Sequence, residues 1–302
     1  MPITLQQLSR RAFIKCAALT STALACGLQA DAGLFFRHRN RHRFALLADT
    51  HIAADPNEVS RGVNMADHLK AVVQQVLGHP GQPTATFING DLALKNGQPG
   101  DYTTFKQLIQ PLQAVIPIHL TLGNHDERDH FLEAFATDTQ KSCPVPERYC
   151  KVLETGRANL YLLDSLDKTD STPGEIGALQ REWLERELTA RPKKPAIIFA
   201  HHNLNQSGLI AGLKDTTAFA AQMAVHPQVK AFVFGHTHDW NIRQNESGVH
   251  LVNLPPVAYT FAAERPSGWV CAEILRDGMK LELISLDPKH PEHGKVEELK
   301  WR

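Results

Sequence analysis

Five short apolar stretches of this 302-residue chain are each followed at once by carboxylate, amide or imidazole side chains. The stretches RFALLA, TATFIN, VIPIHLTL, PAIIFA and VKAFVFG are rich in Ile, Val, Leu and Phe, as buried strands are. The polar residues that follow them are Asp49 and His51; Asp91; Asn124, His125 and Asp126; His201 and His202; and His236 and His238. In layered α/β folds the carboxyl ends of strands meet at one edge, where ligands bind. The pattern therefore predicts a polar site assembled from distant parts of the chain.

The segment FGHTHDW places His236 and His238 one residue apart after the last of these stretches. Residues i and i+2 of an extended chain point the same way, so both imidazoles can reach one point. The chain has 16 histidines, and a close pair can also arise by chance, so the companion residues have to decide. Glycine precedes Asp91, Asn124 and His236, where the backbone needs a positive φ or room for close approach. Together these features favour a metal site.

The composition is that of an ordinary globular protein, with 42% hydrophobic and 21% charged residues. Helical spacing is found between several of the apolar stretches, at NMADHLKAVVQQVLG, DYTTFKQLIQPL, HFLEAFA and IGALQREWLEREL. Further strands are expected at KVLETGRANLYLLD, VHLVNLP, GWVCAEIL and MKLELISL. The alternation predicts α/β layering, followed by consecutive strands in roughly the last fifty residues. No Ser/Gly-rich linker interrupts it, so residues 44–302 are expected to form a single domain.

The first residues of the chain have the order of an export signal. SRRAFIK at residues 9–15 precedes the apolar run CAALTSTALACGL, and QADAG then offers a small-residue cleavage site ending at Ala32. This resembles a twin-arginine signal, so residues 1–32 are expected to be a signal peptide that is recognised by the twin-arginine export machinery. The protein is then periplasmic or extracellular. The alternative is an amphipathic or core helix with a chance Arg pair.

A basic cluster, RHRNRHR, ends the segment 33–43, which is expected to be a solvated leader into the first strand. Phosphate or nucleic-acid binding is the alternative for this cluster. The chain has 32 basic and 32 acidic residues, so no overall field favours nucleic acid as a partner. The apolar run before it is short for a membrane span, and Ala23 stands where a lipid-attachment signal at Cys26 usually has Leu. No stable membrane anchor is therefore expected.

Three cysteines lie beyond residue 32, at Cys143, Cys150 and Cys271. Export would permit a disulfide, and the pair in CPVPERYC could close a small loop. Reduced thiols are the alternative. None of the three has the spacing of a metal motif.

The motifs DxH, GD, GNHD, HH and GHxH, in this order over residues 49–238, resemble those of the calcineurin-like metallophosphoesterase family. GNHDERDHF and LQREWLEREL are most similar to the branch that contains cyclic-nucleotide and glycerophosphodiester phosphodiesterases. One departure is HHNLNQSG, where those relatives usually have prolines after the double histidine. The resemblance implies an α/β fold, a sandwich of two mixed β-sheets flanked by α-helices.

The resemblance also implies a pair of metal sites that share Asp91. One metal ion is expected to be bound by Asp49, His51, Asp91 and His238, and the other by Asp91, Asn124, His201 and His236. Oxygen and imidazole ligands without thiolate suit Mn, Fe, Zn or Co ions, divalent or trivalent. A hydroxide bridging the two ions attacks phosphorus in this scheme. His125 is the expected general acid, and His202 either contacts the phosphate, supports the site or merely packs beneath it.

The expected function is therefore an exported phosphoric ester hydrolase with a small-molecule phosphate ester as substrate. A phosphodiesterase is favoured over a broad phosphomonoesterase. A metal-dependent nuclease is disfavoured because no long basic surface follows the leader. An inactive scaffold should lack ligands, and none is missing here. Specificity is expected to lie in residues 203–214 and 55–61.

Overall fold

The computed structural model describes residues 4–5, 42–135, 143–205 and 211–302. Its larger sheet has seven strands, which are, in spatial order, β1 (Thr4–Leu5), β6 (Ile118–Thr121), β5 (Ala85–Asn89), β2 (Arg43–Leu47), β13 (Gly268–Ile274), β14 (Gly278–Ser285) and β15 (Val296–Lys300). Strands β2, β5 and β6 are parallel, whereas β13, β14 and β15 continue the sheet in antiparallel fashion. The expected run of consecutive strands near the C-terminal end is confirmed.

A second sheet has six strands, which are, in spatial order, β11 (Asn241–Gln244), β12 (His250–Asn253), β10 (Val229–Phe234), β9 (Ala196–Phe199), β8 (Asn159–Leu162) and β7 (Lys151–Glu154). Its four central strands are parallel, and β7 and β11 pair antiparallel at the two edges. The stretch KVLETGRANLYLLD thus forms a hairpin of two strands. Strand β11 was not expected from the sequence.

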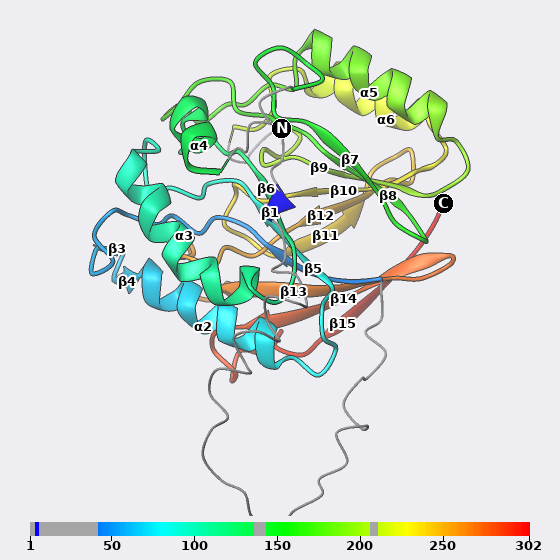
Figure 1. Ribbon diagram of the computed structural model, residues 1–302. Coiled ribbons are helices and arrows are strands. Elements are labelled where there is room, and N and C mark those ends of the chain that lie inside the picture. Colours follow the sequence, from blue (N-terminus) through cyan, green and yellow to red (C-terminus); the bar gives the residue numbers. More distant parts are fainter. Residues whose placement is uncertain (1–3, 6–41, 136–142, 206–210) are drawn as a thin grey trace, which may run out of the picture.

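Helices cover the outer face of each sheet, so the molecule has four layers (Figure 1). The helices are α2 (Met65–Gly78), α3 (Pro99–Gln113) and α4 (Arg128–Phe135) on the larger sheet, and α5 (Ala178–Ala190) and α6 (Thr216–Val225) on the smaller one. Asn64 caps the N-terminus of helix α2, and its side chain accepts a hydrogen bond from the Asp67 backbone NH at 2.9 Å. A short hairpin of β3 (Val59–Ser60) and β4 (Val63–Asn64) precedes it.

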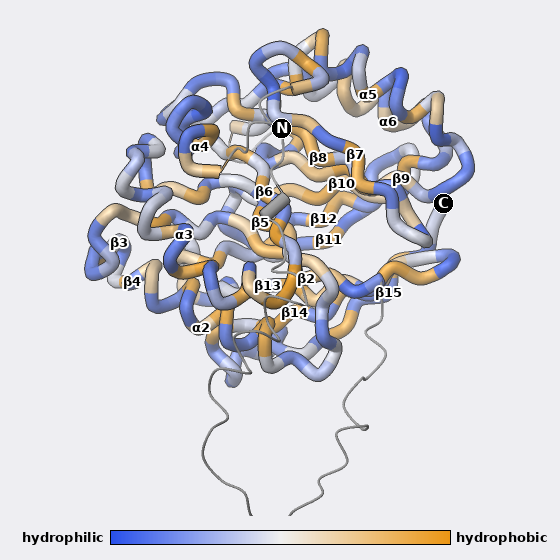
Figure 2. The backbone as a smooth tube through the Cα atoms, in the orientation of Figure 1, coloured by the Kyte–Doolittle hydropathy of each residue, from blue (hydrophilic) through white to orange (hydrophobic). Residues whose placement is uncertain are grey.

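Side-chain alternation along the strands divides the core into three apolar clusters. In β2, Phe44 and Leu46 face the second sheet, and Ala45 and Leu47 face the helices. Phe87 of β5 stacks on Phe199 of β9 with ring centroids 5.1 Å apart, which joins the two sheets. Figure 2 shows the apolar strands inside and polar helix surfaces outside. The expected sandwich of two mixed sheets flanked by helices is confirmed.

The N-terminal region differs in one respect from the expectation. The expected signal peptide and leader lie outside the described residues, except for Thr4–Leu5 and residues 42–43. Thr4 and Leu5 pair with His119 and Ile118 of β6, although residues 1–32 were expected to take no part in the fold. Strand β6 otherwise ends the sheet, and its open backbone groups offer a place for an added strand. Arg43 already belongs to β2, one residue before the expected domain start.

The structure also bears on the cysteines and on membrane spans. Cys150 and Cys271 carry free thiols, so the loop-closing disulfide between Cys143 and Cys150 is not formed. Burial raises the pKa of Cys150 and of Cys271 to about 12 each. Within the described ranges, no helix has the length and apolar character needed to span a bilayer.

Candidate metal centre

The predicted site residues follow the carboxyl ends of five parallel strands and meet where the two sheets adjoin. The larger sheet supplies them after β2, β5 and β6, and the smaller sheet after β9 and β10. A cavity of about 520 Å³ opens over them and is lined by His51, Asp91, Asn124, His125, His236 and His238 among others. Asp49 and His201 are fully buried beneath it. The tertiary structure therefore brings all seven predicted ligands to one place.

The backbone at these ligands adopts an unusual conformation. Nine non-glycine residues of the described chain have positive φ, and five of them are predicted ligands, namely Asp49 (54°), His51 (48°), Asp91 (48°), His236 (70°) and His238 (54°). Left-handed backbone disfavours residues with a Cβ and persists where the surroundings enforce it, often at functional sites. Each sharp bend after a strand directs the ligand side chain into the shared centre.

Glycine is required beside the ligands for the two reasons expected. Gly90 has φ of 79°, and a Cβ there would lie 2.5 Å from His201 Nδ1. Gly123 does not have positive φ, but a Cβ there would lie 2.2 Å from Asp91 Oδ1. A side chain at either position would displace a predicted ligand.

Four histidines each direct one ring nitrogen to the centre. Nδ1 of His51, His201 and His238 lies near the carbonyl oxygens of Leu94 (3.2 Å), Asn89 (2.9 Å) and Tyr259 (2.5 Å), and Nε2 of His236 lies 3.0 Å from the Ala211 carbonyl oxygen. A carbonyl oxygen only accepts, so the facing nitrogen carries the proton. The other nitrogen of each neutral ring then has a free lone pair, which is the arrangement that orients histidine toward a metal.

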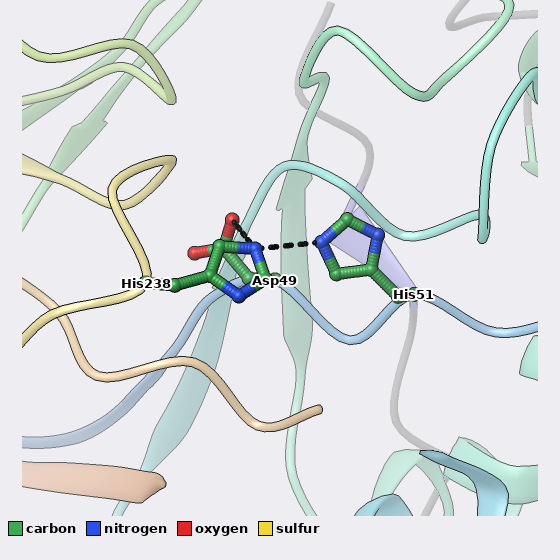
Figure 3. Close-up of side chains that lie close together, drawn as sticks. All are labelled: Asp49, His51 and His238. Atoms are coloured by element: carbon green, nitrogen blue, oxygen red, sulfur yellow. Dashed lines mark hydrogen bonds and ion pairs between the residues drawn. The ribbon is translucent and has the colours of Figure 1, made fainter. Parts of the chain in front are cut away.

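The first group of ligands is Asp49, His51 and His238 (Figure 3). His238 Nε2 lies 3.0 Å from His51 Nε2 and 3.6 Å from Asp49 Oδ1. Two lone pairs that face each other at this distance repel unless a cation lies between them. This arrangement fits a metal ion well.

The second group is Asp91, His201 and His236. Asp91 Oδ2 lies 3.2 Å from His201 Nε2 and 3.7 Å from His51 Nε2, so the same oxygen faces both groups. Its other oxygen accepts a hydrogen bond from the His125 backbone NH at 2.8 Å. Asn124 Oδ1 is buried without a hydrogen-bond partner, and it remains available as a neutral oxygen ligand.

Burial controls the protonation of these side chains. It lowers the pKa of His51 and of His236 to about 3 and that of His238 to about 4, which keeps three rings neutral and ready to bind metal. Burial raises the pKa of Asp49 to about 7. Burial also opposes the cation of His201, but the carboxylates of Asp91 and Asp49 outweigh it and raise that pKa to about 9.

His125 lies at the cavity wall and is partly exposed. Its Nδ1 lies 2.7 Å from the Lys95 carbonyl oxygen and 3.8 Å from Asp170 Oδ1. Because Nδ1 donates to the carbonyl, Nε2 is the nitrogen that can hold and release a second proton. This geometry is compatible with the general-acid role, which stays a prediction.

His202 is too deeply buried to contact a substrate directly. It is fully buried, its ring centroid is 4.6 Å from that of His236, and its Nδ1 lies 2.8 Å from Ser165 Oγ. Among the options left open by the sequence, this position fits support of the metal site and disfavours contact with the phosphate.

Asp126 has a role that the sequence did not reveal. Its buried carboxylate accepts backbone hydrogen bonds from Leu92 (3.2 Å), Ala93 (3.2 Å) and Gly123 (2.9 Å), and the Tyr102 hydroxyl donates to it at 3.2 Å. It therefore fastens the loop after β5 to the loop after β6. Burial, with the charge of Asp91, raises its pKa to about 7. The sequence signal for this role was the acidic residue that ends GNHD, the third carboxylate after those of Asp49 and Asp91.

A sequence model of the calcineurin-like phosphoesterases matches residues 42–240, about two thirds of the chain. The chain belongs to this family. With its clusters of Asp and His ligands, it is a metal-dependent phosphoesterase.

Two relatives are just over a quarter identical to this chain over the aligned residues. A 3′,5′-cyclic-nucleotide phosphodiesterase of Nostoc sp. is 27% identical over 73% of this chain and 80% of its own length. The 3′,5′-cyclic adenosine monophosphate phosphodiesterase CpdA of Escherichia coli K12 is 28% identical over 79% of this chain and 87% of its own length.

Solved structures agree with the fold. A dimetal phosphatase from Danio rerio has a TM-score of 0.67 at 16% identity and covers 87% of this chain and 100% of its own. A purple acid phosphatase from yellow lupin seeds has a TM-score of 0.62 at 16% identity, over 85% of this chain and 52% of its own.

Proposed function

We propose that this phosphoesterase is a phosphodiesterase that uses two metal ions. The observation that carries the proposal is the position of Asp91, whose Oδ2 faces His201 of one ligand group at 3.2 Å and His51 of the other at 3.7 Å. Mn, Fe, Zn or Co ions suit these oxygen and imidazole ligands. When bound, such ions neutralise charge on a phosphate and lower the pKa of coordinated water.

The remaining steps fall to residues of the chain. The His125 backbone NH donates a hydrogen bond to Asp91, which fixes the position of the shared carboxylate relative to the His125 backbone. The alkoxide that leaves phosphorus needs a proton, and His125 Nε2 is the ring nitrogen not turned to the Lys95 carbonyl oxygen, so it is the nitrogen we assign to this transfer. Asp170 provides an ion-pair partner for the protonated ring. His202 and Asp126 support the centre from behind.

The relatives suggest a first group of substrates. Their names describe hydrolysis of cyclic nucleotides, which are phosphodiesters. We propose the same bond class here, with a small-molecule ester as substrate and no role for nucleic acid.

The proposal is tested with purified protein of measured metal content and a matched pair of esters, bis(4-nitrophenyl) phosphate and 4-nitrophenyl phosphate. A higher kcat/KM for the diester supports the proposal. A clear preference for the monoester would make the protein a phosphomonoesterase, and two bound metals without turnover of either ester would indicate an inactive scaffold.

We also propose that the protein is exported through the twin-arginine pathway to the periplasm or the medium. SRRAFIK and the apolar run after it support this proposal, because that order of residues is typical of such signals. Folding before export would allow metals to be loaded in the cytoplasm.

A further inference from the structure

One wall of the cavity consists of two aromatic rings and a guanidinium group. The Arg61 guanidinium carbon lies 4.9 Å from the Phe261 ring centroid and 5.5 Å from that of Tyr259. Both rings also pack on the predicted ligand His238, with centroid distances of 4.4 Å for Phe261 and 4.9 Å for Tyr259. The wall is therefore continuous with the metal centre. We call Arg61, Tyr259 and Phe261 the stacking wall.

Phe261 is unusually exposed for its size. The residue is 51% exposed, although it lines the cavity next to buried predicted ligands. A flat group of a ligand that covered this ring would remove its exposed apolar surface from water, which favours binding. An exposed aromatic ring beside a reaction centre is a frequent feature of ligand sites.

Arg61 occupies a backbone position that disfavours its residue type. It forms, with Gly62, the two-residue turn between β3 and β4, and both have positive φ, 52° and 79°. Such turns prefer Asn, Asp or Gly at both central positions, because a residue with a longer side chain is disfavoured there. The turn projects the Arg61 side chain onto the two rings. A strained charged residue at a cavity wall indicates a functional constraint.

The charge of Arg61 is not neutralised by a carboxylate. In residues 42–135, 143–205 and 211–302, no ion pair involves Arg61. Its guanidinium lies over the two π faces and interacts with the Tyr259 hydroxyl on this wall. Guanidinium planes and aromatic rings both stack well on nucleobases. The wall thus offers flat, positively charged surface within reach of a phosphate held at the metals.

We propose that the stacking wall binds the base of a nucleoside phosphodiester, so that the preferred substrates of this site carry a nucleobase on the sugar esterified at phosphorus. This rests on the proposed phosphodiesterase function for its catalytic consequence. The binding preference itself does not depend on which ester is cleaved. Of the two segments expected to determine specificity, residues 55–61 contribute to this wall, whereas residues 206–210 of the other lie outside the described chain.

The first experiment measures binding with two ligands that differ only in the base. Adenosine 5′-monophosphate and ribose 5-phosphate are titrated calorimetrically into metal-loaded protein. We expect the nucleotide to bind about 5- to 100-fold more tightly, the range that base stacking on one aromatic side chain supplies. Phe261→Leu keeps an apolar cover on His238 but removes the ring, and should largely abolish the difference. Phe261→Tyr restores a ring and should keep it.

The second experiment compares cyclic adenosine monophosphate with glycerophosphoethanolamine, a diester without a ring. Phe261→Leu and Arg61→Ala should lower kcat/KM for the cyclic nucleotide about 5- to 100-fold and change the other value less than threefold, with metal content unchanged. Equal losses on both diesters, or loss of metal in Phe261→Leu, would mean that the wall only holds His238, and the proposal would be wrong.

Failure of the two proposals can be distinguished. If wild type binds the nucleotide and ribose 5-phosphate equally, the stacking wall is refuted even if diesters are cleaved. If the nucleotide binds more tightly but no diester is hydrolysed, the stacking wall stands and the phosphodiesterase assignment fails.

Discussion

Among the predicted ligands, Asp91 has the least replaceable position. One carboxylate oxygen faces both ligand groups, the other is fixed by the His125 backbone NH, and Gly123 leaves the carboxylate just enough room. Asn124, in contrast, offers one neutral oxygen to one group. The two side chains should therefore differ in what their removal does.

We expect Asp91→Ala to remove most of the bound metal and to lower kcat at least ~100-fold, since even residues that only support a ligand affect metal sites by about 10- to 100-fold. Asn124→Ala should retain more metal than Asp91→Ala, because it removes a neutral ligand from one ion. Elemental analysis of both variants, with circular dichroism to confirm folding, checks this. Two metals retained by Asp91→Ala would contradict the shared-ligand assignment.

The general-acid role of His125 is separable from metal binding. Positioned proton transfer contributes about 10² to 10⁴ in rate when the leaving group is an alkoxide, and much less when it is a nitrophenolate. We expect His125→Asn to keep its metals, to lose activity on an alkyl diester and to retain much more on a nitrophenyl diester. Measurements of kcat/KM on both esters test this, with His130→Asn, a change on helix α4, as the control. Equal losses on both esters would assign His125 to positioning the phosphate.

At the scale of elements, left-handed backbone bends after the strands position the predicted ligands, and a charged strand closes one edge of the larger sheet. Strand β15 is mostly exposed and charged, and only Leu299 is buried, so its sequence VEELK does not resemble a core strand. Such an edge discourages pairing with other chains. Helix α6 was not expected either, because it buries only Phe219 and Met223 and lacks a strong apolar stripe.

Strand β6 carries a histidine whose protonation opposes folding. His119 is buried, stacks on Phe87 with centroids 4.9 Å apart, and has its pKa lowered from 6.5 to about 3, mainly by burial. Between these values the unfolded chain binds a proton that the folded chain does not, so the free energy of unfolding falls as pH drops below about 6.5.

We expect His119→Gln to flatten this dependence by up to ~1.4 kcal/mol per pH unit between pH 6 and pH 4. Urea unfolding of metal-free wild type and variant over this range gives the difference between the two profiles, from which the metal ligands cancel. Parallel profiles would show that His119 does not titrate in this window.

At the scale of the whole molecule, the predicted metal centre joins the two sheets. Asp49, Asp91 and Asn124 follow strands of the larger sheet, whereas His201, His236 and His238 follow strands of the smaller one. A metal ion held by ligands from both sheets would connect the two halves of the sandwich, besides contributing to the reaction centre.

We expect removal of metal by a chelator to lower the stability of the protein substantially. A ligand that binds only the folded state at 100 times its Kd contributes about 2.7 kcal/mol. Thermal unfolding before and after chelation, with metal content measured each time, should show a lower Tm for the metal-free protein and recovery on adding metal back. An unchanged Tm after complete removal would argue against a centre shared between the sheets.

In the export proposal, residues 1–32 direct the precursor to the twin-arginine machinery. Arg10→Lys combined with Arg11→Lys should leave full-length precursor in the cytoplasm, while esterase activity in the lysate survives. Fractionation with immunoblotting measures this, and the wild-type precursor is the control. Efficient export of the double variant would refute the twin-arginine signal, and loss of lysate activity would give the pairing of Thr4–Leu5 with β6 a structural role.

The sequence alone determined the apolar strands that carry the site and the polar residues that follow them. Local periodicity specifies each apolar strand, and the residue after a strand needs only the chain direction to be placed at the carboxyl edge. Five strands ending in ligand-type residues thus predicted a site before any contact was known.

Only the tertiary structure decided how these ends act together. The ring nitrogen that each histidine presents depends on carbonyl groups remote in sequence, such as that of Asn89 for His201. Local sequence also does not show that Asp126 joins two loops. Nor does it show that Arg61 contacts Tyr259 and Phe261, some two hundred positions away. These contacts join groups that are remote in sequence and meet only when the whole sandwich packs, and no local pattern in the chain records which distant groups will meet.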